Sequence, residues 1–277
     1  MRKILVSFLF FGLLTTISFG FETFNVWNGQ APGEKEETTP PTLELWQPAE
    51  RSTDACLIVC PGGGYYGLAY EHEGEKIANY FNGKGVTVVV LKYRVPRREG
   101  VPKHLPAWQD SQRCVRFVRS HAEDWNINPE KIGMMGFSAG GHLTLMTATT
   151  SQTAAYEPVD ELDKVPCHLN FAIPVYPAYV LLDGNDNPNS EKGNNSEMVD
   201  DFAFDAKTPP ICLIHGDDDV YSPMGSVAVY HKLRTMGIPG ELHIFAKVGH
   251  GFGGNPTDTH VGDWLNRVYA WMGVMGF

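Results

Sequence analysis

Cysteine and positive charge are both scarce in this 277-residue sequence. Its five cysteines include no Cys-x-x-Cys pair, so the spacing typical of a structural zinc site is missing. Lysine and arginine number 22 against 32 aspartate and glutamate residues, and the resulting charge of −10 argues against the basic surface that nucleic-acid binding needs. The 43% hydrophobic content excludes a disordered or collagen-like chain.

Long apolar runs are also missing, except at the N-terminus. Residues 1–20 begin with Arg2 and Lys3, continue with an apolar stretch over 4–14, and end in Ser18-Phe19-Gly20, a small-residue cleavage site. This pattern is typical of a secretory signal peptide. An uncleaved membrane anchor is the alternative, but the stretch is short for a bilayer span. We therefore expect an acidic protein, secreted or periplasmic, with no membrane attachment once the signal is removed.

Strand-like and helix-like patterns alternate along the rest of the chain. Residues 21–42 are rich in proline, glycine and glutamate and predict an irregular entry arm. Several later runs are almost continuously apolar, as strands buried on both faces are. The expected strands are 55–60, 86–91, 131–135, 169–175, 211–215 and 241–245, and the expected helices are 105–121, 222–236 and 261–275. The alternation predicts a single-domain α/β fold with a mostly parallel central sheet flanked by helices.

One segment, residues 177–208, breaks this alternation. It contains GNDNPNSEKGNNSE and predicts a polar loop insertion over the sheet, with a glycosylation sequon at Asn194. Among the cysteines, Cys56, Cys60 and Cys212 lie in the apolar runs, so we expect them to be buried small hydrophobic residues. Disulfide pairing and oligomeric state stay open.

A G-x-S-x-G motif at residues 136–140 follows one expected strand and precedes a helical stretch. A serine on such a sharp turn adopts strained backbone angles, and its close neighbours Gly136 and Gly140 leave no room for side chains. The turn exposes the Ser138 hydroxyl at the N-terminus of the next helix, which can stabilise negative charge. The alternative is a glycine-rich turn with an incidental serine.

Two further motifs make that alternative less attractive. The run CPGGGYY at 60–66 follows a strand, and its backbone N–H groups can point at a developing oxyanion. A phosphate-binding loop is excluded there because no GK[ST] follows at the required spacing. Downstream, HGDDD at 215–219 and GHGFG at 249–253 each follow a strand. The order Ser…Asp…His is that of hydrolase triads.

The stretches PGGGYYGLAYEHEG, LKYRVP, GFSAGGHL, HGDDDVYSP and ELHIFAKVGHGFG resemble the α/β-hydrolase family, in particular its secreted carbohydrate-esterase branch related to acetylxylan and feruloyl esterases. The resemblance covers roughly residues 43–275 and implies a catalytic domain over 21–277. Many esterases carry histidine before the glycine run, whereas this chain has Pro61, as that branch does.

The family pattern H-G-x-x-D-x-x-x-P selects Asp219 as the acid, with Asp217 and Asp218 as turn residues. His250 lies between glycines after the last strand, which suits a catalytic base. The other histidines have simpler explanations. We expect His142 to pack within its helix, His215 to hydrogen-bond locally and His72 to lie in a solvated loop.

The resulting hypothesis is acyl transfer by Ser138 as nucleophile, His250 as base and Asp219 as the residue that orients it. The expected oxyanion donors are the N–H groups of Ala139 and of Gly63 or Gly64. No metal or organic cofactor is required.

The expected partner is a small-molecule or polysaccharide ester. Exposed aromatic rings can stack on sugars, and Tyr65, Tyr66, Trp108 and Tyr179 are candidates, although core packing explains them equally well. The resemblance implies removal of acetyl groups from xylan, with hydrolysis of feruloyl esters as the alternative activity. Amide chemistry, as in a peptidase or arylformamidase, and a non-catalytic binding protein on a hydrolase scaffold are further alternatives.

Overall fold

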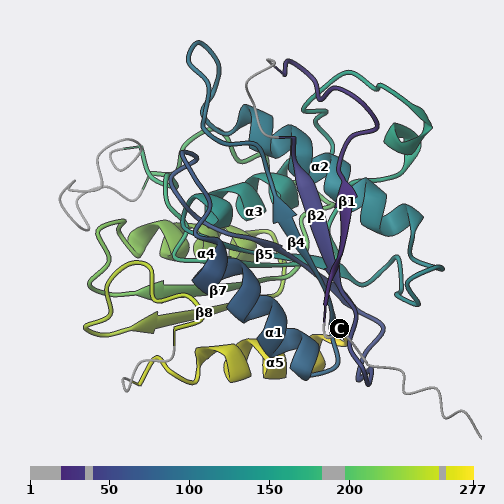
Figure 1. Ribbon diagram of the computed structural model, residues 1–277. Coiled ribbons are helices and arrows are strands. Elements are labelled where there is room, and N and C mark those ends of the chain that lie inside the picture. Colours follow the sequence, from purple (N-terminus) through teal and green to yellow (C-terminus); the bar gives the residue numbers. More distant parts are fainter. Residues whose placement is uncertain (1–19, 35–39, 183–196, 256–259) are drawn as a thin grey trace, which may run out of the picture.

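A computed structural model describes residues 20–34, 40–182, 197–255 and 260–277. Its centre is an eight-stranded sheet with the order β1-β2-β4-β3-β5-β6-β7-β8 (Figure 1). The strands are β1 Glu22–Asn25, β2 Thr42–Trp46, β3 Cys56–Cys60, β4 Thr87–Lys92, β5 Ile132–Phe137, β6 Phe171–Val175, β7 Ile211–Gly216 and β8 Gly240–Phe245. The six strands from β3 to β8 are parallel, which confirms the predicted sheet.

The other two strands correct the prediction for the N-terminal part of the chain. The segment expected to be an irregular entry arm contains β1, which pairs antiparallel with β2, and β2 pairs antiparallel with β4. β1 is largely exposed and only four residues long, so it has no apolar run to identify it. Its position comes from backbone pairing at the sheet edge rather than from its own pattern. The expected signal peptide, apart from its last residue, lies outside the described residues.

Helices cover both faces of the sheet, giving three layers (Figure 1). The helices are α1 Lys76–Gly83, α2 Leu105–Ser120, α3 Ala139–Thr149, α4 Met224–Thr235 and α5 Trp264–Met275, with a π-helical turn at Glu71–Glu75 and a 3-10 turn at Glu161–Lys164. Apolar residues of α1 and α5, such as Phe81 and Trp271, pack in one hydrophobic cluster. Residues of α2 and α4, such as Val118 and Leu233, pack in the other cluster. Each face of the sheet is thereby shielded from water.

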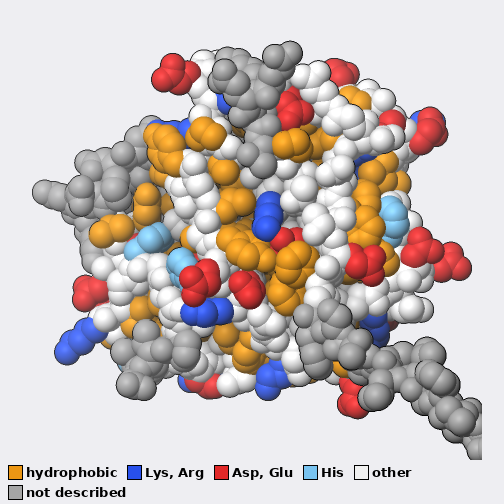
Figure 2. All heavy atoms as spheres, in the orientation of Figure 1, with side chains coloured by type: hydrophobic (Ala, Val, Ile, Leu, Met, Phe, Trp, Pro, Cys, Tyr) orange, Lys and Arg blue, Asp and Glu red, His pale blue; other side chains and the backbone are white. Residues whose placement is uncertain are grey.

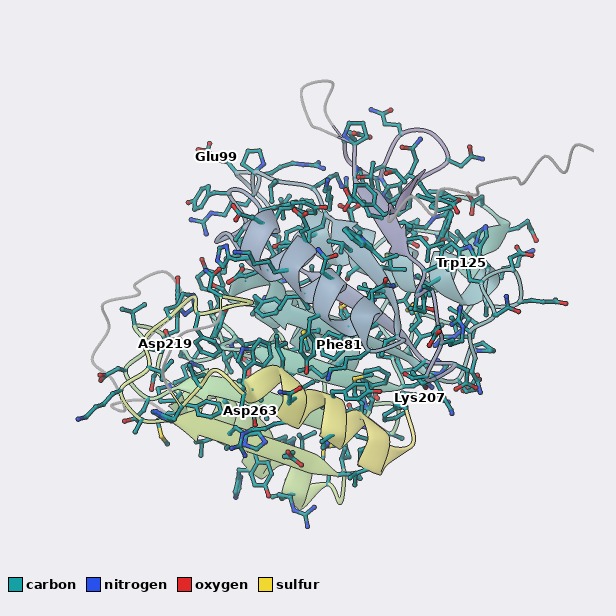
Figure 3. The ribbon with its side chains drawn as sticks, turned by 60° about the horizontal axis from the view of Figure 1, so that its bottom comes forward. Phe81, Glu99, Trp125, Lys207, Asp219 and Asp263 are labelled. Atoms are coloured by element: carbon teal, nitrogen blue, oxygen red, sulfur yellow. The ribbon has the colours of Figure 1, made fainter. Side chains whose placement is uncertain are left out.

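Parallel strands place the segments that follow them along one edge. In Figure 3, Asp219, which follows β7, and Glu99, which lies between β4 and α2, are on the same side of the molecule, while Trp125 and Lys207 are on the opposite side. This edge, outside the carboxyl ends of the strands, is where open α/β sheets bind their ligands.

On the face seen in Figure 2, acidic and basic side chains are interspersed with hydrophobic ones. Within the described ranges, no helix combines the length and the apolarity that crossing a bilayer demands. All five cysteines are buried and free, as expected for Cys56, Cys60 and Cys212.

The ends of the 177–208 segment differ from the expected polar loop. Tyr179 and Leu181 are buried on one side of the segment and Phe202 on the other, and Leu181 forms a β-bridge with Met198. Tyr179 and Phe202 belong to the hydrophobic core and anchor the two ends of the segment. The polar centre of the segment, including the sequon at Asn194, lies outside the described residues.

Candidate active site

Ser138 stands on a strained turn between β5 and α3. Its φ of 53° and ψ of −117° fall in a region that residues with side chains rarely adopt. A Cβ added at Gly136 would lie 2.0 Å from the Gly140 carbonyl oxygen, and one added at Gly140 would lie 2.1 Å from the Cys60 oxygen. Both glycines are therefore required by close backbone approach, as the motif predicted.

The imidazole of His250 joins Ser138 to Asp219. The Ser138 Oγ lies 2.8 Å from the His250 Nε2, and the His250 Nδ1 lies 2.9 and 2.8 Å from the two Asp219 carboxylate oxygens. A carboxylate only accepts hydrogen bonds, so the proton belongs on Nδ1, and Nε2 is the acceptor for the serine hydroxyl. This is the tautomer that a general base needs.

The three side chains come from three strand ends. Ser138 follows β5, Asp219 follows β7 and His250 lies in the loop after β8. The Asp219 side chain is fully buried, the His250 side chain is 23% exposed and Ser138 is 9% exposed. The acid is thus shielded from water, whereas the base is partly exposed.

Of the three consecutive aspartates, only Asp219 is hydrogen-bonded to His250 in the structure. Asp217 and Asp218 are exposed, and the Asp219 Oδ1 also accepts a hydrogen bond of 2.8 Å from the Tyr221 backbone N–H. This second donor fixes the carboxylate orientation.

The glycine loop at 62–64 packs directly on the serine turn. A Cβ added at Gly62 would lie 2.9 Å from the Ser138 Cβ, and Gly63 and Gly64 have φ values of 133° and 65°. The Gly62 N–H already donates to the Glu73 Oε2 over 2.7 Å, which leaves the next two N–H groups of the loop as candidate oxyanion donors. Ala139 is the first residue of α3, so its N–H has no acceptor within the helix.

Glu73 is a buried residue of the site that the sequence analysis missed. Besides Gly62, its carboxylate accepts a hydrogen bond of 2.7 Å from the Tyr176 hydroxyl, and that hydroxyl accepts one of 2.9 Å from the Gly253 N–H. Glu73 thereby links the glycine loop to the loop that carries His250. The run EHEGE carries no signal that singles out Glu73, because Glu71 and Glu75 flank it and only tertiary contacts bury the middle glutamate.

The surrounding helical turn corrects the expectation for His72. The run EHEGE forms the π-helical turn rather than a loop, and the His72 carbonyl accepts a hydrogen bond of 2.7 Å from the Gly254 N–H. The backbone of this turn therefore holds the loop that follows His250.

His142 and His215 have the surroundings expected from the sequence. His142 is buried within α3, and its Nδ1 lies 2.8 Å from the Tyr65 hydroxyl. His215 bonds locally, with its Nδ1 2.8 Å from the Ser226 Oγ and its Nε2 3.1 Å from the Tyr221 carbonyl oxygen. Burial lowers the pKa of His215 to about 4 and that of His142 well below its ordinary value, so both rings are neutral at pH 7.

The aromatic candidates for sugar contact differ in how far their rings are exposed. Tyr65 is only 1% exposed and stacks against Tyr179, so it supports the site from within instead of offering an open surface. Tyr66 is 61% exposed, and the Arg97 guanidinium lies 4.4 Å from its ring centroid. Tyr66 also lines a cavity of about 620 Å³. Trp108 is half-buried against the core.

This sheet, with a strained serine after β5 and an acid and a base after later strands, defines the class of α/β hydrolases. More narrowly, the chain belongs to the BD-FAE family, whose model matches residues 43–201.

The structural likeness extends over nearly the whole chain. An acetyl ester-xyloside bifunctional hydrolase from Caldicellulosiruptor lactoaceticus superposes with a TM-score of 0.77 at 28% identity, covering 95% of this chain and 99% of that one. An esterase of Thermogutta terrifontis gives a TM-score of 0.70 at 21% identity over 93% of this chain and 95% of its own. The latter comparison supports the fold alone.

Curated relatives match only in part. An acetylxylan esterase of Xylanibacter ruminicola is 29% identical over 241 residues, which cover 80% of this chain and 47% of that protein. An endo-1,4-beta-xylanase B of Butyrivibrio fibrisolvens is 42% identical over 88 residues, covering 32% of this chain and 14% of that protein. The chain therefore spans about half the length of the first relative and less of the second.

Proposed function

We propose that this protein is a serine carboxylesterase that hydrolyses carbohydrate-linked esters through an acyl-enzyme. The observation that carries the proposal is the continuous contact from the Ser138 Oγ to the His250 Nε2, at 2.8 Å, and from the His250 Nδ1 to the buried Asp219. This arrangement allows His250 to take the hydroxyl proton as the serine oxygen attacks an ester carbonyl. Asp219 then stabilises the imidazolium.

The oxyanion formed by this attack would be held by backbone N–H groups. The N–H of Ala139 at the start of α3 and that of Gly63 or Gly64 are the proposed donors. Their positions are fixed by the tight packing of the glycine loop on the serine turn, so little reorganisation accompanies the reaction. Loss of one such donor typically costs about 3 kcal/mol of transition-state stabilisation.

The second half of the reaction regenerates the enzyme. His250 gives its proton to the alcohol oxygen as the ester C–O bond of the substrate breaks, which leaves the acyl group on Ser138. Water then enters from the exposed side of the imidazole and loses a proton to the same ring as it attacks the acyl carbon. The bond from the acyl group to the Ser138 Oγ breaks, His250 returns the proton to that oxygen, and the acid leaves. The 23% exposure of the His250 side chain supports access for this water. The chemistry needs only these side chains and the oxyanion donors.

For the substrate, we propose acetyl esters on xylan or a related polysaccharide. Support comes from the names of two similar proteins, an acetylxylan esterase and an acetyl ester-xyloside bifunctional hydrolase. It also comes from Tyr66, an exposed ring that follows the glycine loop and lines a cavity of about 620 Å³, where a sugar ring can stack. A substrate of this size agrees with export by the N-terminal signal peptide, which is part of the same proposal.

A test of the proposed chemistry compares wild-type enzyme with Ser138→Ala on p-nitrophenyl acetate. We expect the substitution to lower kcat by roughly 10⁴-fold or more, because it removes the nucleophile. Equal rates in the two proteins would eliminate Ser138 from the mechanism. An anilide analogue in parallel distinguishes esterase from amidase activity, and absence of turnover on every substrate would favour the binding-protein alternative.

The substrate proposal needs its own panel. Acetylated xylan, methyl ferulate and p-nitrophenyl esters of increasing chain length should be compared by kcat/KM. We expect the acetyl substrates to be preferred, with Tyr66→Ala raising KM on acetylated xylan but not on p-nitrophenyl acetate. A preference for methyl ferulate would assign feruloyl esters instead.

A further inference from the structure

Three potential metal ligands converge next to the serine helix, although they are far apart in the sequence. His104 directly precedes α2, His142 lies on α3 and Asp201 follows the β-bridge at Met198. One ligand atom from each of the three lies within 4.8 Å of the others. His142 is fully buried, His104 is 7% exposed and the Asp201 side chain is 39% exposed.

Both imidazoles have a buried nitrogen with no hydrogen-bond partner. These atoms are the His142 Nε2 and the His104 Nδ1, and the nearest Asp201 oxygen is 3.8 Å from the latter. A buried polar atom without a partner typically costs about 1–3 kcal/mol, so such atoms in a native protein need an explanation. A bound ion at this point would supply the missing partner for both.

The environment also prepares the rings for coordination. The His142 Nδ1 can donate its proton to the Tyr65 hydroxyl oxygen at 2.8 Å, which leaves the Nε2 lone pair free. Metal-binding histidines commonly have such a partner on the other ring nitrogen.

We propose that His104, His142 and Asp201 form a binding site for a divalent transition metal, with Zn²⁺ as the best match. Two imidazole nitrogens and one carboxylate are a ligand set that zinc uses with a fourth position open to water. Nitrogen ligands disfavour Ca²⁺ and Mg²⁺, which prefer oxygen. His104 and Asp201 line the cavity of about 620 Å³ beside Tyr66, which provides an entry path for the ion.

A second cluster fits a metal less well. Cys212, Glu241 and His243 also lie close enough to share an ion. However, the His243 Nε2 already forms a 2.7 Å hydrogen bond with the Glu241 Oε1, and burial raises the pKa of the Cys212 thiol far above its ordinary value. Binding there would break an existing contact and expose a thiolate to an apolar interior, so this cluster serves as the internal control.

The proposed ion would act on structure rather than on the ester bond. It would connect the start of α2, the serine helix α3 and the segment after Met198. His142 lies one helical turn beyond Ser138, and its partner Tyr65 directly follows the glycine loop. We therefore expect metal binding to stabilise the elements behind the serine, whether or not the proposed esterase activity is correct.

The test measures zinc binding to the chelator-treated full-length protein by calorimetry. We expect one equivalent of Zn²⁺ to bind with a Kd in the micromolar range or tighter, and saturating Zn²⁺ to raise the Tm by several degrees. Co²⁺ in the same position should give the visible absorption of a four-coordinate nitrogen and oxygen site. No saturable zinc binding to the wild type would overturn the proposal.

Substitutions of the proposed ligands test whether zinc binds at these residues. Asp201→Asn and His104→Ala should each lower zinc affinity at least tenfold and abolish the Tm shift, whereas His243→Ala should retain both. Asp201 is partly exposed, so its variant is expected to fold even if His104→Ala does not. Ser138→Ala should bind zinc like the wild type, which separates this proposal from the esterase proposal. Unchanged binding by Asp201→Asn, or lost binding by His243→Ala, would assign the zinc elsewhere.

Discussion

The Tyr176 hydroxyl donates a 2.7 Å hydrogen bond to the buried carboxylate of Glu73. Burial, reinforced by Glu73, raises the pKa of Tyr176 well above its ordinary value, so the hydroxyl stays protonated and can donate. The same carboxylate holds the Gly62 N–H, and the same hydroxyl holds the Gly253 N–H. The two residues thus fix the glycine loop and the histidine loop relative to each other.

This link makes Glu73 a positioning residue, so its substitution should lower kcat. In Glu73→Gln, an amide N–H₂ replaces one acceptor oxygen, so either the Gly62 N–H loses its acceptor or the Tyr176 hydroxyl must turn its proton away and accept from the amide. We expect kcat on p-nitrophenyl acetate to fall about 10- to 100-fold with little change in KM, because small displacements of oriented groups are costly.

The neighbouring Glu71→Gln is the matched control, because its side chain is 81% exposed. It should leave kcat unchanged. If Glu73→Gln affected KM alone, or matched the control, the link would not position the reacting groups.

Gly136 should tolerate no side chain. In Gly136→Ala the new Cβ would lie 2.0 Å from the Gly140 carbonyl oxygen, so the serine turn must shift or the protein must unfold. We expect a destabilisation of several kcal/mol, measured by urea unfolding, and loss of activity in any folded fraction. Gly273→Ala, in α5 with open space around it, should be neutral or stabilising by up to about 1 kcal/mol. Similar unfolding curves for both variants would contradict the close approach.

Acidification should destabilise the protein through His215. Its pKa of about 4 in the folded state lies below the ordinary value of 6.5, because burial outweighs the favourable field of Asp219. The unfolded chain therefore binds a proton first as the pH falls below 6.5, and stability decreases down to about pH 4, where the folded state also takes up the proton. The loss is on the order of 3 kcal/mol for this group.

Urea unfolding at several pH values between 7 and 4.5 measures this effect. His142, whose pKa burial also lowers, contributes with the same sign. We expect His215→Gln to be less stable at pH 7 but to show a shallower pH dependence than the wild type. Identical slopes would mean that His215 is not the responsible group.

The buried ion pair between Arg94 and Asp110 should be important for stability. Asp110 is fully buried and accepts hydrogen bonds from the Arg94 backbone N–H, the Arg94 Nε and the Trp27 Nε1. Asp110→Asn leaves the guanidinium without its countercharge, and breaking such a pair typically costs about 3–5 kcal/mol. Thermal and urea unfolding measure the loss.

The exposed pair of Lys164 and Glu161 provides the comparison, with side chains 73% and 87% exposed. Glu161→Gln should change stability by no more than about 0.5 kcal/mol. A loss in Asp110→Asn as small as this would show that the buried pair contributes little.

The sequence predicts the part of this structure that depends on local pattern. The strands from β3 to β8 appear within two residues of their expected bounds. Short apolar runs between turn signals are typical of buried strands. β1 escaped prediction because its four residues carry no apolar run, and only pairing with β2 makes them a strand.

The active site likewise combines residues that a local motif identifies with one that only tertiary packing identifies. Ser138, Asp219 and His250 are recognisable because each follows a strand in a motif with a fixed spacing, and the structure brings the three together. Glu73 lies between two other glutamates, and nothing in the local spacing marks it as the one that turns inward. Its role depends on contacts with Gly62 and Tyr176, which are set by tertiary packing. Convergence of that kind cannot be deduced from spacing along the chain.

The central claim is that Ser138 is the nucleophile activated by His250. It is tested most directly by mass spectrometry after reaction with an organophosphonate that modifies activated serines. We predict loss of activity with one adduct per chain, mapped to the peptide carrying Ser138 and absent in His250→Ala at the same exposure time. Complete inactivation with the adduct on another residue, or full esterase activity with Ser138 unmodified after prolonged reaction, would contradict the account.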